Sequence, residues 1–469
     1  MQEKHAVWLT ELAEQADRAF HGSEQGRWLR WAEREHDNVR AALAWAVERQ
    51  DAELAERLAA ALAWSWLLHQ RWTEGLEWVS RALALPRPAP TRQRGSLLLH
   101  AIELTLFRGD MTSNRPGHLS AARQWLEELQ GLAEALADDH LLLAAYGLLG
   151  LFEEQGITLP GLVAKREDEM QAMARRVGDP WGECRGLEAL ARQALRAGDL
   201  EGASAHLAAA IEIARGIGDT WSLAMALNEL GDVERAREAH RRALALYHES
   251  RALFGQLGLG AQPTLVHNLG YAALAIHDYA QAAAHFVDAL VEFRRVGERR
   301  GIAECFVAIG CLSAAQGRVA DAARLFGAGE AGLEALRAEI WPANRPTYEH
   351  WLSRARSRMR AAEFDQAWAE GRELPLEQAT VLALESTTGR PRPAAHVDYR
   401  AQLLTPRERE LAELVAQGFT NRQIADALVI ADKTVANHLQ RVLEKLDVRT
   451  RTQLAARAAA LGLATSQGR

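Results

Sequence analysis

The sequence predicts an all-α fold in which a long array of paired helices is followed by a small domain of four helices. Three observations support this prediction. Apolar residues recur at helical spacing along most of the chain, and we find no convincing run with the alternation of a half-buried strand. In the middle of the chain, glycine followed by an acidic residue returns at steps of about 40 residues, which indicates repeated helical pairs. The residues from 401 onward show shorter helices with closely spaced turns.

Residues 1–90 are expected to form amphipathic helices that are unusually rich in tryptophan. These tryptophans are Trp8, Trp28, Trp31, Trp45, Trp64, Trp66, Trp72 and Trp78. Tryptophan at helical spacing most often builds a core, because each ring buries a large apolar area. The alternative interpretation is an aromatic-lined ligand site. His36 lies among charged residues on a helix face, and we expect it to be a surface histidine without a catalytic or metal-binding role.

Residues 91–384 are predicted to form a helical-repeat array. One turn signal recurs at Gly178-Asp179, Gly218-Asp219, Gly258 and Gly297-Glu298. A second precedes alanine-rich helices at Gly198-Asp199-Leu200, His277-Asp278-Tyr279 and Gly317-Arg318-Val319. The pattern is similar to tetratricopeptide-like repeats, but the period is longer than their roughly 34 residues, so helices or loops must be lengthened.

Stacked helical pairs form a curved array with a concave surface, because one pair alone cannot bury its apolar face. We expect this array to bind an effector, either a ligand or a protein, whose identity the sequence does not give. The alternative is an array that only spaces or oligomerises the C-terminal domain. Residues 385–400 then read as a linker, since they carry Ser, Thr, Gly and two X-Pro steps without periodicity.

Residues 401–469 are predicted to fold as four short helices with a helix-turn-helix in the middle. Leu411, Leu414 and Val415 share one face of the first helix, which follows Thr405-Pro406. Thr420 opens the second helix. On the third helix, the apolar residues Val435, Leu439, Val442 and Leu446 project to one side. In such a motif the opposite side of this helix enters the major groove of double-stranded DNA.

The outward side of the third helix carries hydrogen-bonding residues. Asn437 and Gln440 are the best candidates for base readout, because an amide can donate to and accept from adenine at once. Lys433, Arg441, Lys445 and Arg422 are better suited to phosphate contacts.

Many residues of this segment resemble the LuxR-type DNA-binding domain: Thr405 to Glu410, Gly418, Asn421, Ile424-Ala425, Leu428, Ile430, Thr434-Val435, His438, Lys445-Leu446, Val448 and Arg451-Thr452. The projection and the resemblance together imply a DNA-binding set made of Thr420, Asn421, Arg422, Lys433, Thr434, Ala436, Asn437, Gln440, Arg441, Lys445, Arg449 and Arg451. Two positions depart from the pattern. Ala431 stands where relatives usually have a capping Ser, and Ala436 where they usually have Lys or Arg, so both should weaken DNA binding.

The fourth helix presents Leu454, Ala458 and Leu461 on one face, and we expect a homodimer to close there, although part of the stripe must serve the domain's own core. Upstream, residues 28–43 and 371–379 resemble the helical region of large LuxR-type regulators of the signal-transducing NTPase class. Their nucleotide-binding module is absent, since no Gly-Lys-Ser/Thr occurs in the chain. An ATP-driven switch therefore fits the relatives and not this sequence.

Charge is distributed as a DNA-binding tail requires. The whole chain has a net charge of −7, but from residue 401 onward ten Lys and Arg stand against seven Asp and Glu. The tail is therefore net +3 and the remainder net −10. A helical scaffold with a weakened DNA-binding tail is the alternative to a transcription regulator.

No HExxH, GxSxG or CxxC motif occurs, and Cys184, Cys305 and Cys311 match no metal or disulfide pattern. We expect no cofactor, no metal and no enzymatic activity. The chain begins with a charged segment and has no apolar run of about 18 residues, so we expect a cytoplasmic protein without a membrane segment.

Overall fold

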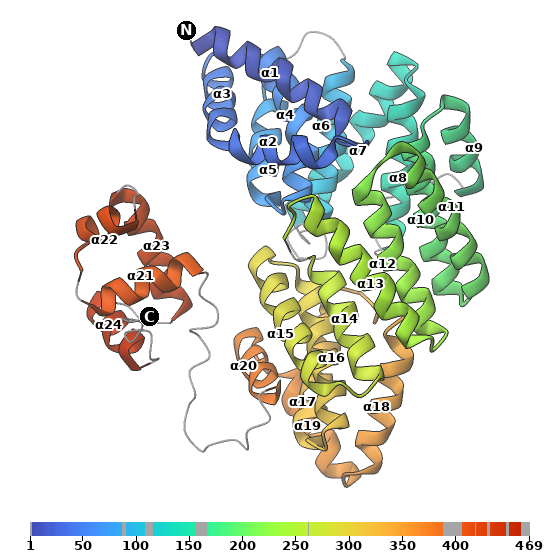
Figure 1. Ribbon diagram of the computed structural model, residues 1–469, viewed down its shortest axis with the longest axis vertical. Helices are drawn as coiled ribbons and strands as arrows, with labels where there is room; N and C mark the ends of the chain where they lie inside the picture. Colours follow the sequence, from blue (N-terminus) through green and yellow to red (C-terminus); the bar gives the residue numbers. More distant parts are fainter. Residues whose placement is uncertain are drawn as a thin grey trace. The chain divides into compact units, whose positions relative to one another are not determined.

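The computed structural model describes residues 2–86, 91–107, 116–154, 167–260, 262–387, 406–417, 419–428, 432–446 and 450–460. Every regular element in these ranges is a helix, so the prediction of an all-α fold is confirmed. The chain divides into two compact units, Met1–Thr387 and Thr388–Arg469 (Figure 1). No helix in the described part is long and apolar enough to span a membrane.

The first unit opens with α1 (Gln2–Ala19), α2 (Gln25–Arg34), α3 (His36–Glu48), α4 (Ala52–Leu68) and α5 (Trp72–Leu83). Helix α4 is buried along nearly its whole length. Trp64, Trp66 and Trp78 lie in the hydrophobic core, which confirms the core interpretation for them. Trp8 is the exception, since 51% of it is exposed.

The tryptophan-rich helices do not form a core of their own. They are followed by α6 (Arg92–Phe107), α7 (Pro116–Leu136), α8 (Asp139–Glu154) and α9 (Glu167–Val177). One hydrophobic cluster runs from Ala6 through α6, α7 and α8 and includes residues as far along the chain as Ala272, whereas Met173 and Ala174 of α9 belong to a separate small cluster. The buried side chain of Gln25 also joins distant parts of the chain, because it donates to Asp219 Oδ1 at 3.0 Å and accepts from the Trp221 backbone N–H at 2.9 Å.

The middle of the first unit is a stack of helical pairs. Their helices are α10 (Pro180–Ala197), α11 (Leu200–Ile217), α12 (Thr220–Ala236), α13 (His240–Gln256), α14 (Pro263–Ala275), α15 (Tyr279–Val296), α16 (Arg299–Ala315) and α17 (Val319–Ala335). They follow one another in sequence order, from green to orange in Figure 1. All but α14 have 17 or 18 residues and most turns between them are short, so lengthened helices account for the period.

The glycine and the acidic residue of the repeated signal have separate roles. Gly198, Gly218 and Gly297 end helices in the left-handed conformation, with φ of 79°, 74° and 77°, which glycine adopts without a steric cost. The residue that follows caps the next helix. Asp199 Oδ1, for example, accepts the Gly202 N–H at 2.9 Å.

The first unit ends with α18 (Arg345–Ser357), α19 (Ala361–Arg372) and α20 (Leu376–Thr387). The predicted linker boundary was wrong by three residues, because residues 385–387 continue α20. The physical reason is that the end of this helix is packed, with Leu384 and Ser386 both buried. The remaining linker positions, 388–400, lie outside the described residues. The three cysteines, Cys184, Cys305 and Cys311, are buried free thiols.

The second unit contains α21 (Pro406–Ala416), α22 (Asn421–Leu428), α23 (Asp432–Lys445) and α24 (Arg451–Ala460). The four predicted helices are therefore present. They enclose a separate hydrophobic cluster made of Leu411, Ala412, Val415, Ile424, Ala425, Val435, Val442, Leu446, Leu454 and Ala458.

Candidate nucleic-acid interface

Helix α23 is oriented in its domain as the sequence predicts. Val435, Val442 and Leu446 are fully buried in the hydrophobic cluster, and Leu439 packs against it. Because a helix buried on one side presents the other side outward, Ala436, Gln440 and Arg441 are exposed. The second unit thus offers one polar helix face on which a nucleic-acid duplex could lie.

Helix α22 is fixed at both ends by side chains. At its beginning, Thr420 N–H donates to Gln423 Oε1 at 2.9 Å, and Gln423 N–H donates to Thr420 Oγ1 at 3.4 Å, a reciprocal cap that satisfies two otherwise unpaired donors. At its end, the guanidinium of Arg407 donates to the backbone oxygen of Leu428 and to Glu410 Oε2. The prediction that Thr420 opens this helix is confirmed.

An ion pair connects α21 with the end of α23. Lys445 Nζ lies 2.6 Å from Glu408 Oε2, and the Glu408 side chain is only 4% exposed. A buried carboxylate needs a cation or hydrogen-bond donors, because desolvation of a lone charge is costly. Lys445 therefore holds α21 and α23 together, so any phosphate contact it makes would have to compete with Glu408.

Arg451, a second cation of the predicted DNA-binding set, also makes contacts within the domain. Arg451, at the start of α24, donates to Asn421 Oδ1 at 2.7 Å and to the backbone oxygen of Phe419. These contacts position the turn that precedes α22. Asn421 and Arg451 thus contact each other inside the domain, and both are only partly exposed.

The predicted DNA-binding residues fall into three groups. Thr420, Arg422, Ala436, Gln440 and Arg441 are exposed, while Asn421, Thr434, Lys445 and Arg451 are half-buried. The side chains of Lys433 and Asn437, and the whole of Arg449, lie outside the described residues. Their place at the interface stays a prediction.

Arg407 and Glu408 were not predicted to have a role in this domain. A signal for Glu408 was available, since it lies three and seven residues before Leu411 and Val415 and so falls on the buried face of α21. A carboxylate on an apolar face indicates an internal cation, and Lys445 was the cation to consider.

Two residues of the expected dimer stripe on the C-terminal helix serve the domain's own core. Leu454 and Ala458 are fully buried in the domain's own core, because α24 packs on α21. A homodimer cannot close on these two side chains without opening the domain. Leu461 lies outside the described residues, so a dimer contact through α24 would have to use other positions of that helix.

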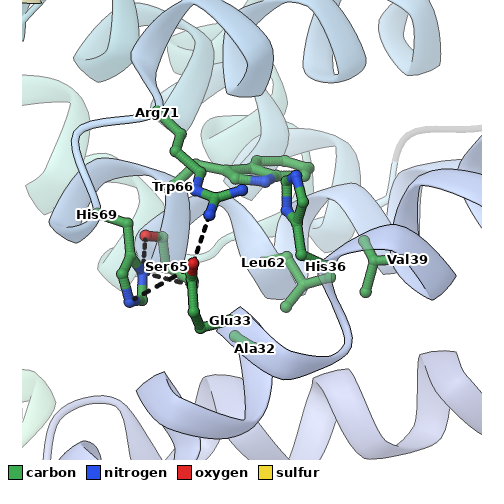
Figure 2. Close-up of a pocket in the computed structure, with 9 residues that line it drawn as sticks. All are labelled: Ala32, Glu33, His36, Val39, Leu62, Ser65, Trp66, His69 and Arg71. Carbon is green, nitrogen blue, oxygen red and sulfur yellow. Dashed lines mark hydrogen bonds and ion pairs between the residues drawn. The ribbon is translucent and has the colours of Figure 1, made fainter. Parts of the chain in front are cut away.

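A hollow among the N-terminal helices was the other candidate site. Figure 2 shows His36, His69, Glu33 and Arg71 around it, with Trp66 behind them. Arg71 pairs with Glu33 at 2.6 Å, and burial lowers the pKa of both histidines. Its volume of about 10 Å³ holds no more than one water, so it gives the alternative of an aromatic-lined ligand site no support.

His36 differs from its expected surface position. Its side chain is only 19% exposed and lies 3.3 Å from Glu74 Oε1. Among the described residues, no group of three or more His, Cys, Asp or Glu side chains could hold a metal ion.

Comparison with known proteins identifies the second unit. Residues 402–458 match the luxR family of bacterial regulatory proteins. The spore germination protein GerE of Bacillus subtilis is 49% identical over 51 residues, which cover 11% of this chain and 69% of GerE. The tetrathionate response regulatory protein TtrR of Salmonella typhimurium is 55% identical over 53 residues, 11% of this chain and 26% of TtrR.

A longer match extends upstream of this unit. An HTH-type transcriptional regulator of Mycobacterium bovis is 32% identical over 166 residues, which cover 35% of this chain and 18% of the relative. The chain thus matches less than a fifth of the length of that protein. Among solved structures, a Rap protein complexed with competence and sporulation factor has a TM-score of 0.44 and 12% identity, covering 79% of this chain and 100% of that one, a similarity too low to carry an argument.

Proposed function

Because the chain belongs to the LuxR family of bacterial regulatory proteins, we propose that it is a non-enzymatic transcription regulator that binds operator DNA through α23. One observation carries the proposal: the apolar side of α23 is buried in the domain core, so the side with Ala436, Gln440 and Arg441 faces outward. A helix held in this way can enter the major groove, which is wide enough to admit it.

The proposed contacts divide by chemistry. Gln440, with Asn437 one turn earlier, reads base edges through its amide. Arg441 and Arg422, both exposed, contact phosphates, and Lys433 joins them. Two copies of the chain bind two half-sites, as helix-turn-helix dimers do, and this takes place in the cytoplasm, where bacterial DNA lies.

The helical array of the first unit is proposed to be the sensor or interaction part. Stacked helical pairs offer an extended surface for a ligand or protein, and binding there regulates the affinity of the second unit for its operator. The net charge of −10 upstream of residue 401 supports DNA binding by the second unit alone, because the first unit has no general attraction to phosphates.

Selection of binding sites from a random duplex library by the purified full chain tests the proposal. We expect an enriched sequence that the chain binds with a steep salt dependence. Arg441→Glu should abolish this binding. Arg241→Glu makes the same charge change at an exposed position of α13 in the array and should leave binding intact. If no duplex is enriched and both variants behave like the parent, the scaffold alternative holds instead.

A further inference from the structure

The connection between α17 and α18 is longer than most turns of the helical stack. Residues 338–344 follow Arg337 and precede α18. Residues 338–341 are irregular, and 342–344 form a turn in which the Asn344 N–H donates to the Trp341 backbone oxygen at 2.8 Å. The segment reaches beyond its neighbour α16, because it also contacts α12, two helical pairs earlier in the stack. Ala343 and Asn344 are buried, whereas residues 338–342 are partly or fully exposed.

Trp341 is held by its backbone and by its side chain. Its N–H donates to Glu304 Oε1 of α16 at 2.7 Å, and its indole Nε1–H donates to Asp232 Oδ2 of α12 at 3.1 Å. The guanidinium groups of Arg196 and Arg300 lie 5.6 and 5.7 Å from the ring centroid, within the range of cation–π attraction. The surroundings are therefore complementary to a tryptophan.

Asn344 and the residue before it are recognised in the same way. Arg235 of α12 donates to the Ala343 backbone oxygen at 2.7 Å and to Asn344 Oδ1 at 2.9 Å. The Asn344 Nδ2–H donates to Glu304 Oε2 at 2.9 Å. Both faces of the asparagine amide are thus satisfied, one by a cation and one by a carboxylate.

The groups that hold the segment are also held by residues outside it. The Arg235 guanidinium is fixed by Asp232 Oδ1 at 3.1 Å and the Tyr247 hydroxyl at 3.3 Å, and it lies 5.0 Å from the centroid of the Tyr271 ring. Asp232, Arg235 and Glu304 are each at most 5% exposed. We call the site that these three residues form beneath the segment the inner groove. Its donors and acceptors match a turn that presents an indole and, three residues later, an amide.

We propose that the inner groove is a peptide-recognition site that the chain fills in cis with residues 338–344. A partner peptide that carries tryptophan followed three residues later by asparagine competes with this segment. This inference rests on the proposed function only in taking the array as its interaction surface. The segment is suited to be displaced, because most of it is partly exposed and it is tethered to the stack at both ends, whereas the groove residues lie on packed helices.

The test supplies the segment in trans. In the full chain, residues 338–344 are replaced by seven Gly and Ser residues, and a fluorescein-labelled peptide of residues 337–346 is titrated into it. We expect saturable binding. Peptides with Trp341→Ala or Asn344→Ala should bind at least about tenfold more weakly, since each loses hydrogen bonds to charged groups. The parent chain should bind no peptide at these concentrations, because a tethered segment competes at an effective concentration of about a millimolar.

A replaced chain that keeps the parent's circular dichroism but binds no peptide, or binds a scrambled peptide equally well, would overturn the proposal. If the replaced chain does not fold, the parent with Trp341→Ala and Asn344→Ala together takes its place, with the same expectation and the same refuting outcomes. No DNA is present in this titration. A failure here therefore leaves operator binding untouched, and a failure to bind DNA leaves the peptide result standing.

Discussion

Gln440 and Arg441 are neighbours on the exposed side of α23, but we expect them to serve different purposes. Gln440→Ala should cost roughly 1–3 kcal/mol on the preferred duplex and little on a scrambled one, because an amide reads bases. Asn437→Ala should behave in the same way. Arg441→Ala, like Lys433→Ala, should weaken both duplexes alike and lower the salt slope by about one, because it removes a phosphate contact.

Salt titrations followed by fluorescence anisotropy on both duplexes measure these effects. Equal losses on the two duplexes for Gln440→Ala and Asn437→Ala would mean that another side of the helix faces the bases. That result would leave the fold of the second unit unquestioned and would move the readout to other residues.

Ala436 offers a gain-of-function prediction, because it is exposed on the same side of α23. The resemblance to LuxR-type domains implies a cation at this position. Ala436→Lys should tighten binding to specific and scrambled duplexes alike and steepen the salt slope by about one. Ala436→Gln is the matched control for side-chain length without charge. If the lysine variant left the slope unchanged, this position would not face the phosphates.

Asp17 on α1 should make stability depend on pH. Burial raises its pKa to about 6 from an ordinary value near 3.8, although His100 and Arg18 oppose the rise. Since the folded state binds the proton more tightly, the free energy of unfolding should fall as pH rises from about 4 to about 6. Asp17→Asn should remove this fall and add up to about 3 kcal/mol at pH 7.

Tryptophan fluorescence during urea unfolding measures this effect, because all tryptophans of the chain lie in the first unit. Glu11→Gln, an exposed carboxylate on the same helix, is the control and should change little. If Asp17→Asn kept the pH dependence of the parent, that dependence would come from other buried groups.

The residues of the DNA-binding face were predictable to different extents. Val435, Val442 and Leu446 repeat at helical spacing, so the sequence alone indicated which side of α23 is buried. The pairing of Lys445 with Glu408 was not predicted, because it joins residues 37 positions apart whose spacing carries no periodic signal. A cation in a basic segment therefore reads as a phosphate contact until its three-dimensional neighbours are known.

Close packing within the helical pairs relies on glycine. In α14, a Cβ at Gly270 would lie 2.5 Å from Phe286 of α15. Gly231 meets Tyr247, and Gly310 meets Phe326, in the same way. Each aromatic ring is fully buried and cannot move aside cheaply, so the glycine permits the close approach of the two helices.

Gly270→Ala should therefore lower the free energy of unfolding of the first unit by about 1–3 kcal/mol, through overpacking against Phe286. Gly186→Ala is the matched control, since it lies inside α10 with no atom within 4 Å of the added Cβ. The control should raise the free energy of unfolding by up to about 1 kcal/mol, because alanine is less flexible in the unfolded chain. Equal effects of the two changes in urea unfolding would contradict this packing argument.

Most of the left-handed turn residues of the stack were visible in the sequence as glycines, and the others were hidden. Gly198, Gly218 and Gly297 indicate a left-handed residue, because glycine is the residue that most readily adopts this conformation. Glu238 and Arg337 take the same conformation, with φ of 62° and 53°, and carry no such signal. Tertiary packing of the flanking helices can impose this conformation on an ordinary residue at a modest cost. The period of the array was therefore predictable, but not every turn in it.

The architecture of the first unit depends on contacts that no local pattern contains. The boundary suggested near residue 90 follows a change in composition, yet one hydrophobic cluster spans Ala6 to Ala272. The insertion of residues 338–344 between α12 and α16 is equally invisible, because Trp341 and Asp232 are 109 positions apart. The helices and their period can be predicted from the sequence. The contacts between distant helices cannot, because they depend on side chains far apart in the chain.

The division into two compact units allows a test of whether the array regulates the DNA-binding domain. A fragment that begins at Ala395 contains the whole second helical set and lacks the first unit. The fragment keeps the net positive charge of the tail and lacks the net charge of −10 that the upstream residues contribute. It should therefore bind non-specific duplex more tightly than the full chain at low salt. This difference should vanish at high salt, because salt screens the charges. On the operator, the full chain should respond to a peptide or cell extract that the fragment ignores. Anisotropy titrations of both proteins, with and without extract, decide this. If fragment and full chain showed the same operator affinity and salt slope in every condition, the array would have no part in controlling DNA binding.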